Sequence, residues 1–123
     1  MESKSLQATE ELGAAGAKEF RITLDYIKSQ IRSIYWMSGY DFVHSAGTAE
    51  HNVKYVDHKD LETSTICMIH MKNGFRVFGH SAPLSVENFD PAKGRTFAYE
   101  DAFRQLWPLF AFAVKEMKRD AGE

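Results

Sequence analysis

A two-residue signal, Asn73-Gly74, constrains the fold of this 123-residue chain more than any other feature. It separates two strand-like runs, residues 64–71 and 75–81. Both central positions of a two-residue type I′ turn need a positive φ, which Asn and Gly adopt most readily. The pattern therefore predicts an antiparallel β-hairpin. Pro83 should end its second strand, because proline cannot donate a hydrogen bond to the ladder.

The two strands differ in the faces that they should bury. The first contains Thr65, Ile66, Cys67 and Ile69 and is apolar on both faces, which is typical of a covered sheet. In the second strand, successive side chains should point to opposite faces of the sheet. Its alternation puts Phe75, Val77 and Gly79 on one face, and Arg76, Phe78 and His80 on the other.

The segments before the hairpin are less regular. Residues 1–20 contain Gly13 and Gly16, which oppose a helix, and we expect a flexible N-terminal arm. Thr23 is a good N-cap for a helix reaching about Ile34, with apolar residues at helical spacing. The aromatic stretch 35–42 should be extended or irregular, and residues 44–60 should form a surface loop.

A long helix should follow the hairpin. Asp90-Pro91 predicts its start, because Asp accepts backbone amides at the cap and Pro at the first position loses no hydrogen bond. The helix should run to about Met117, with a kink where Pro108 removes a bond to the Arg104 carbonyl. Residues 106–114 are all non-polar, which predicts burial all round and hints at a subunit interface. The expected fold class is α+β, in one domain spanning residues 21–119.

Composition excludes several classes of protein. A formal charge of −2 and a pI near 6.2 give no general attraction to DNA, RNA or an anionic membrane. No apolar run approaches the ~20 residues that cross a bilayer. The single cysteine, Cys67, excludes an intrachain disulfide framework and fits a reducing compartment. We expect a cytoplasmic protein.

No catalytic or metal-binding motif is present. The five histidines have no zinc-site spacing, and Cys67 and His70 point to opposite faces of a strand. Cys67 sits among apolar neighbours, where a small buried side chain is the usual role and a nucleophile is not. Neither phosphate-loop pattern occurs. The sequence predicts no enzyme activity, metal or cofactor.

Polar and aromatic side chains gather instead around the hairpin and the start of the long helix. The candidate ligand-binding residues are Phe75, Arg76, Ser85, Glu87, Asn88, Asp90, Arg95 and Arg104. A ring can stack on a base, amide and carboxylate groups can read its edges, and guanidinium groups can neutralise phosphate. The alternative is purely structural, since caps and turns favour the same residue types.

The order of short motifs resembles a phage protein family of the gene-49/gene-66 type. The motifs are Lys72-Asn73-Gly74-Phe75, the run 85–90 (SVENFD), Gly94-Arg95 and Trp107-Pro108-Leu109. The upstream run 22–27 followed by Tyr35-Trp36 extends the likeness over residues 21–117. Phe78 and His80 depart from the family pattern, so a bulkier and less acidic pocket is expected.

This family resemblance implies an anti-defence role in the host cytoplasm. Thoeris anti-defence sponges look like members, binding cyclic ADP-ribose isomers made by TIR-domain enzymes, and some bind cyclic oligonucleotides. The resemblance further implies a homodimer or higher oligomer with a site shared between subunits. Phe75 is expected near the base, Glu87 and Asn88 at polar edges, and Arg95 near phosphate. The alternative function is a phage inhibitor that binds a host or defence protein.

Overall fold

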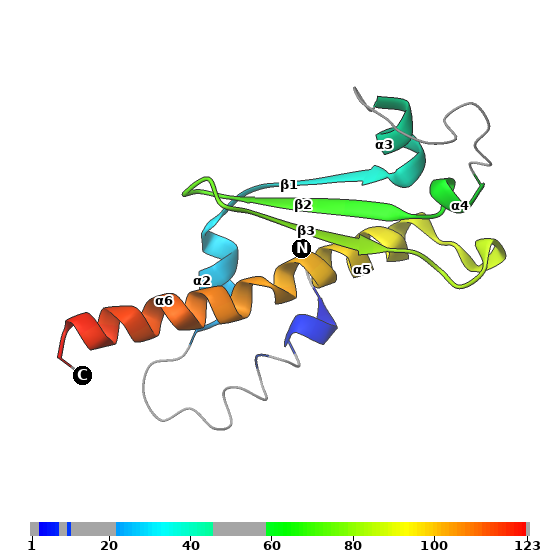
Figure 1. Cartoon of the computed structure of the whole chain (residues 1–123). Coiled ribbons are helices and arrows are strands. Elements are labelled where there is room, and N and C mark those ends of the chain that lie inside the picture. The colour runs from blue at the N-terminus through cyan, green and yellow to red at the C-terminus, as the bar shows by residue number, and fades with distance from the viewer. Residues whose placement is uncertain (1–2, 8–9, 11–21, 46–58, 123) are drawn as a thin grey trace.

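The computed structural model describes residues 3–7, 10, 22–45 and 59–122. The element order is α2 (Leu24–Ser29), β1 (Ile31–Ser38), α3 (Gly39–Ser45), α4 (Lys59–Glu62), β2 (Thr65–Met71), β3 (Arg76–Ser81), the 3₁₀ turn η1 (Val86–Asn88), α5 (Pro91–Arg104) and α6 (Leu106–Asp120). An antiparallel sheet, an N-terminal helix and a long bent C-terminal helix confirm the predicted α+β class (Figure 1).

The sheet is three-stranded, in the order β1-β2-β3, with both neighbouring pairs antiparallel. The predicted hairpin joins β2 to β3, but its turn is not the expected two-residue type I′. Gly74 N donates to Met71 O at 2.9 Å, while Met71 N donates to Phe75 O at 2.8 Å, so the loop has three residues. Gly74 has a positive φ of 92° in this turn. This is the arrangement of a β-turn followed by a glycine bulge.

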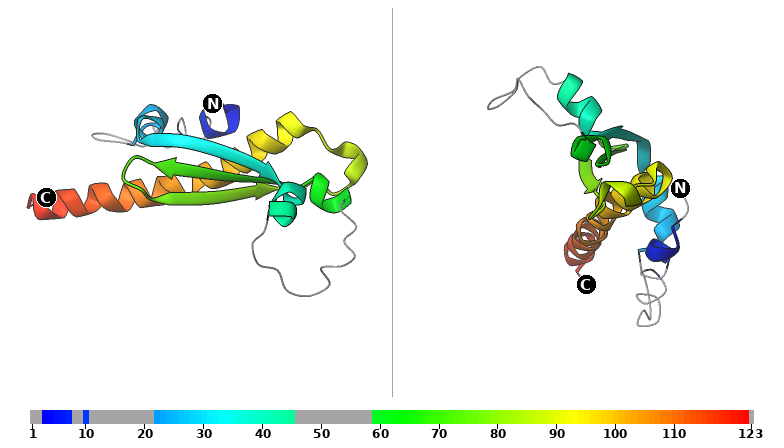
Figure 2. Two further views of the ribbon diagram at one scale, coloured as in Figure 1. Left: turned by 90° about the horizontal axis from the view of Figure 1, so that it is seen from above. Right: turned by 90° about the vertical axis from the view of Figure 1, so that its right-hand side faces the viewer.

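Helix α5 lies across one face of the sheet, against β2 and β3 (Figure 2). The core between them includes Cys67, Ile69, Val77, Tyr99 and Phe103, all nearly or completely buried. The predicted alternation of β3 is confirmed within the strand, since Val77 and Gly79 are buried while Arg76, Phe78 and His80 are exposed. Phe75, predicted on the buried face, precedes the strand and is exposed.

Gly79 sets how closely the helix approaches the sheet. A Cβ at this position would collide with the backbone of Ala98 and Ala102. The α5 backbone therefore rests directly on β3, with only hydrogen and small side chains between them.

The predicted helix to Ile34 is too long. Thr23 caps it as expected, its Oγ1 accepting from Tyr26 N at 3.0 Å, but α2 ends at Ser29. Residues from Ile31 onward pair with β2, where Ile34 and Trp36 reach the core. β-Branched and aromatic residues suit a strand, and pairing with β2 outweighs the apolar spacing that also fits a helix. The aromatic stretch is extended to Ser38 and then helical in α3.

The C-terminal helix begins and bends where proline predicts. Asp90 Oδ1 accepts from Ala92 N and Lys93 N, and Pro91 occupies the first turn. The helix breaks at Gln105, and α6 carries Pro108 in its first turn. The expectation that residues 106–114 are buried all round is wrong within one chain: only Leu106 is fully buried. No helix in the described part of the chain is long and apolar enough to cross a membrane.

Most of the expected N-terminal arm and of the 44–60 loop lies outside the described residues. Within them, residues 4–7 form a helical turn, and Leu6 is fully buried in the core. Ser3 Oγ hydrogen-bonds the buried Glu100 carboxylate on α5. Residues 59–62 form the short helix α4 in place of a loop.

We predict that Gly79→Ala lowers the free energy of unfolding by about 3 kcal/mol or more, because the new methyl group overlaps helix backbone that cannot move alone. Gly74→Ala is the comparison. It strains a positive φ in open space and should lower the same quantity by only about 1 kcal/mol. Urea denaturation measures both. An equal or smaller loss for Gly79→Ala would contradict the close approach.

Burial of Cys67 predicts slow thiol chemistry. Desolvation raises the pKa of its thiol to about 12. At pH 8 the native protein should therefore react with Ellman's reagent only as fast as it unfolds, whereas the unfolded chain should react at once. Because folding raises the pKa of Cys67, ionisation of the thiol favours the unfolded chain. The free energy of unfolding therefore keeps its full value below the unfolded thiol's pKa of ~8.5 and falls as the pH rises from there toward 12. Fast labelling of native protein would contradict the burial.

Candidate functional site

The predicted ligand-binding residues fall into groups at opposite ends of the sheet (Figure 1). Phe75 and Arg76 lie at the hairpin end, whereas residues 85–90 and Arg95 lie where α5 begins. From Phe75 to Ser81, the last residue of β3, the chain advances by six residues. At ~3.3 Å per residue this is about 20 Å. A single chain therefore does not bring the predicted residues together.

A pocket of about 350 Å³ lies at the start of α5. We call it the α5-start pocket; it is lined by Trp36, Met37, Ser38, Asp41, Glu62, Ser64, Thr65, Phe89, Pro91 and Arg95. These residues come from β1, α3, α4, β2 with the residue before it, the segment leading into α5, and α5 itself. The lining combines aromatic rings, hydroxyl groups, carboxylates and one guanidinium. This mixture suits a polar aromatic ligand.

Two contacts shape the α5-start pocket. Trp36 Nε1 donates to Arg95 O at 3.0 Å, which ties the indole on β1 to the second turn of α5. Gly94 lets that turn approach the sheet, since a Cβ there would lie 2.7 Å from Thr65 Oγ1 and 3.2 Å from Phe89 Cε1. The Arg95 side chain is exposed, and so its guanidinium is accessible to an anion.

The segment before α5 presents polar groups to solvent. Ser85 Oγ donates to Glu87 Oε2 at 2.9 Å. A backbone hydrogen bond and this serine hydroxyl lower the pKa of Glu87, so its carboxylate is ionised at neutral pH and acts only as an acceptor. Asn88 is exposed. Asp90 is committed to capping α5 and therefore contributes to the fold rather than to a free binding group.

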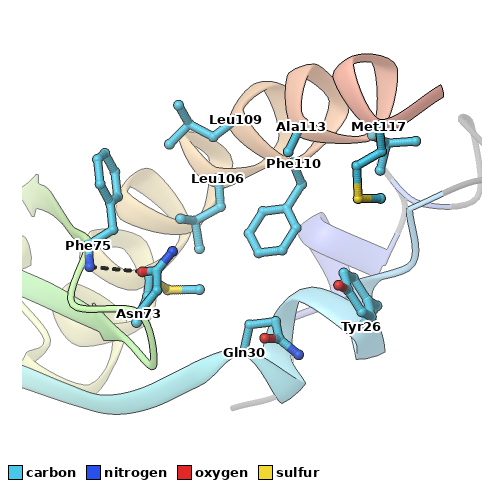
Figure 3. A pocket seen from close by; sticks show the side chains of 11 residues that line it. Tyr26, Gln30, Asn73, Phe75, Leu106, Leu109, Phe110, Ala113 and Met117 are labelled. Carbon is cyan, nitrogen blue, oxygen red and sulfur yellow. Dashed lines mark hydrogen bonds between the residues drawn. The ribbon is translucent and has the colours of Figure 1, made fainter. Parts of the chain in front are cut away.

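A second hollow, the apolar groove, lies at the hairpin end (Figure 3). Its volume is about 360 Å³. It is lined by Tyr26, Gln30, Met71, Asn73, Phe75, Leu106, Leu109, Phe110, Ala113, Val114 and Met117. Phe75 is 51% exposed at the mouth, and its backbone N–H donates to Asn73 Oδ1 at 2.9 Å. Phe75 is thus a surface ring rather than a core residue.

Arg76 and Arg104 line neither hollow. Arg76 is exposed at the first position of β3, on the face turned away from α5. Arg104 ends α5 and its guanidinium contacts Ser5 Oγ near the N-terminus. The inclusion of Arg104 in one site with Asn88 therefore has no geometric support within the chain.

Sequence reasoning missed most of the α5-start pocket. Trp36, Ser38 and Thr65 belong to strands that meet only through sheet pairing, with Trp36 opposite Cys67 and Ser38 opposite Thr65. Phe89 was not among the predicted site residues, yet it lines this pocket. One available signal was Gly94, a glycine inside a helical pattern that indicates close approach to another element.

The α5-start pocket offers groups that could recognise a ligand. Rings, hydroxyls and Arg95 can hold a base, a ribose and a phosphate respectively. The one thiol, Cys67, is buried and protonated at neutral pH, so it is no nucleophile. Among the described residues, no group of three or more His, Cys, Asp or Glu side chains is placed to hold a metal ion.

Comparison with known proteins identifies one family. The family model described as Phage protein (N4 Gp49/phage Sf6 gene 66) family matches residues 22–117. The comparisons with curated proteins and with solved structures found no match. The matched range covers the whole sheet, both hollows and most of α6. The chain therefore belongs to the phage protein (N4 Gp49/phage Sf6 gene 66) family.

Proposed function

We propose that this phage-family protein binds and sequesters a cyclic nucleotide immune signal without breaking it. The proposed ligands are cyclic ADP-ribose isomers made by TIR-domain enzymes, or cyclic oligonucleotides, and the outcome is inhibition of Thoeris-type defence. The α5-start pocket carries this proposal: it places two aromatic rings, Trp36 and Phe89, beside Arg95 and several hydroxyl groups. Its volume of about 350 Å³ lies in the range of small-ligand pockets.

The separation of the predicted residues supports a shared site. Phe75 lies about 20 Å from the start of α5 along β3. A ligand that contacts both Phe75 and Asn88 must therefore take them from different copies of the chain. We propose a homodimer or higher oligomer in which the hairpin of one copy approaches the α5-start pocket of another.

The second candidate is an inhibitor that binds a host or defence protein. The apolar groove favours it, because Leu109 and Met117 on α6 line this hollow of about 360 Å³ and are exposed. Apolar surface of this kind often marks a protein interface. Such an inhibitor would bind its protein partner in buffer free of nucleotides, whereas a sponge would not.

We predict that Arg95→Ala lowers affinity for a cyclic ADP-ribose isomer by about 2 kcal/mol or more, because it removes a charged hydrogen bond to phosphate. Asn88→Ala and Phe75→Ala should also weaken binding, and all three should stay folded because these side chains are exposed. Arg119→Ala is the matched control; its guanidinium pairs with Glu116 on α6 at 2.7 Å, away from the pocket. Calorimetric titration measures each affinity.

The contradicting results are distinct. Unchanged affinity in all three folded variants would place the site elsewhere. No binding of any cyclic ADP-ribose isomer or cyclic oligonucleotide by the wild type would remove the sponge function. Heating the complex and analysing the released nucleotide by mass spectrometry tests turnover: intact ligand is expected, and a linear product would indicate an enzyme.

A further inference from the structure

The two edges of the sheet differ in how the rest of the chain bonds them. β3 forms one edge and β1 forms the other, because β2 lies between them (Figure 1). A strand at an edge carries backbone N–H and C=O groups that point away from its neighbour and need other partners. The partners of these outward groups decide whether an edge can accept a further strand.

At the β3 edge, side chains of the C-terminal helix occupy the outward groups. The hydrogen-bond alternation set at the hairpin makes the backbone groups of Phe78 and His80 point outward. His80 N donates to Asp101 Oδ2 at 3.0 Å, and Gln105 Nε2 donates to Phe78 O at 2.6 Å. Asp101 lies on α5, and Gln105 follows one turn later, where α5 ends. These two side chains therefore block the β3 edge.

The β1 edge has no such cover among the residues that the structure describes. Gly39 N donates to Ser64 O at 3.1 Å, which fixes the hydrogen-bond alternation between β1 and β2. This alternation makes the N–H and C=O groups of Ile34 and Trp36 point outward. No described residue bonds these outward groups, and no described helix or strand runs along the outer side of β1 (Figure 1).

We propose that the β1 edge binds an extended segment of another protein, which adds to the sheet as a further strand. A row of outward backbone groups pairs with an occupant that presents N–H and C=O groups at the same spacing, as an extended peptide does. A helix already uses these groups within itself. The free length runs from Ile34 to Ser38, because β1 is irregular between Ile31 and Ser33. About five partner residues, about 16 Å of strand, can therefore pair.

Charges at the two ends of β1 favour an antiparallel segment. Arg32 is exposed near the start of the strand, and Asp41 is exposed just after its end. An antiparallel segment places its carboxyl end beside Arg32 and its amino end beside Asp41. An acidic residue at the carboxyl end and a basic residue at the amino end then meet opposite charges. Between these ends, partner side chains level with Ile34 and Trp36 lie on the side of the core, where apolar residues fit.

The helix that follows β1 favours a short occupant. α3 projects past the outer side of the sheet where β1 ends (Figure 1). A second copy of the chain placed edge to edge with β1 would bring its own three strands against α3. A segment of about five residues ends before α3. The occupant is therefore a free extended segment of another protein rather than the sheet of a second copy.

NMR hydrogen exchange of the full chain, without nucleotide, tests strand addition. The probe is an octapeptide with lysine first, glutamate last and alternating threonine and valine between them, acetylated and amidated at its ends. In the free protein, the amides of Ile34 and Trp36 should exchange at least about tenfold faster than those of Tyr35 and Met37, which bond β2. The peptide should protect Ile34 and Trp36 and leave Tyr35 and Met37 unchanged.

Methylation of the peptide backbone provides the matched control. Valines level with Ile34 and Trp36 donate their N–H groups to β1, whereas the threonine N–H groups point away from it. Methylating the valine nitrogens should weaken binding about tenfold or more, and methylating the threonine nitrogens by less than about threefold. Arg32→Glu should weaken binding about threefold or more at low salt, whereas Lys115→Glu, exposed on α6, should not.

Three results would overturn strand addition at β1. The first is no protection of Ile34 and Trp36 at millimolar peptide, or protection confined to residues of the apolar groove. The second is an equal loss of affinity from both methylations. The third is protection of Ile34 and Trp36 that grows with protein concentration in the absence of peptide, because it would identify a second copy as the occupant. Strand addition requires no nucleotide, so a protein that binds no cyclic nucleotide would leave it standing.

Discussion

The rest of the structure depends on the direct contact between the α5 backbone and β3. Gly79 permits it, since any side chain at that position would collide with Ala98 and Ala102. The contact encloses Cys67, Val77 and their neighbours in a core that a chain of this size can fill. It holds α5 against the sheet, so the pocket residues on α5, β1 and β2 are carried by elements that the core keeps in place.

Local chemistry in the sequence predicted several elements well. Asp90-Pro91 determined the start of α5, and Thr23 the start of α2, because a cap depends on residues within one turn. The Asn-Gly pair located the hairpin but not its loop length, which the pairing of Met71 with Phe75 decides. The end of α2 could not be predicted from the residues near it in sequence. Ile31 and Ile34 fit a helical face, and only the presence of β2 makes them a strand.

The site was harder to predict than the fold. Residues that are close in sequence, such as Phe75 and Asn88, lie beyond opposite ends of β3. They are far apart because each residue of an extended strand adds ~3.3 Å to its length. Residues that do meet, such as Trp36 and Arg95, are far apart in sequence and joined by a long-range hydrogen bond. The non-polar composition of residues 106–114 led to a wrong prediction of burial within the chain. Composition alone does not distinguish side chains buried in a chain's own core from side chains exposed on its surface, where they can form an interface.

Mixing two defective variants tests the shared site most directly. Chains carrying Phe75→Ala and chains carrying Asn88→Ala would be co-refolded in equal amounts and titrated with a cyclic ADP-ribose isomer. If Phe75 and Asn88 of one site come from different copies, each mixed dimer has one intact site. Random pairing then restores about a quarter of the wild-type binding capacity, although each variant alone binds weakly. A mixture that binds no better than the two variants measured separately would contradict a site shared between copies.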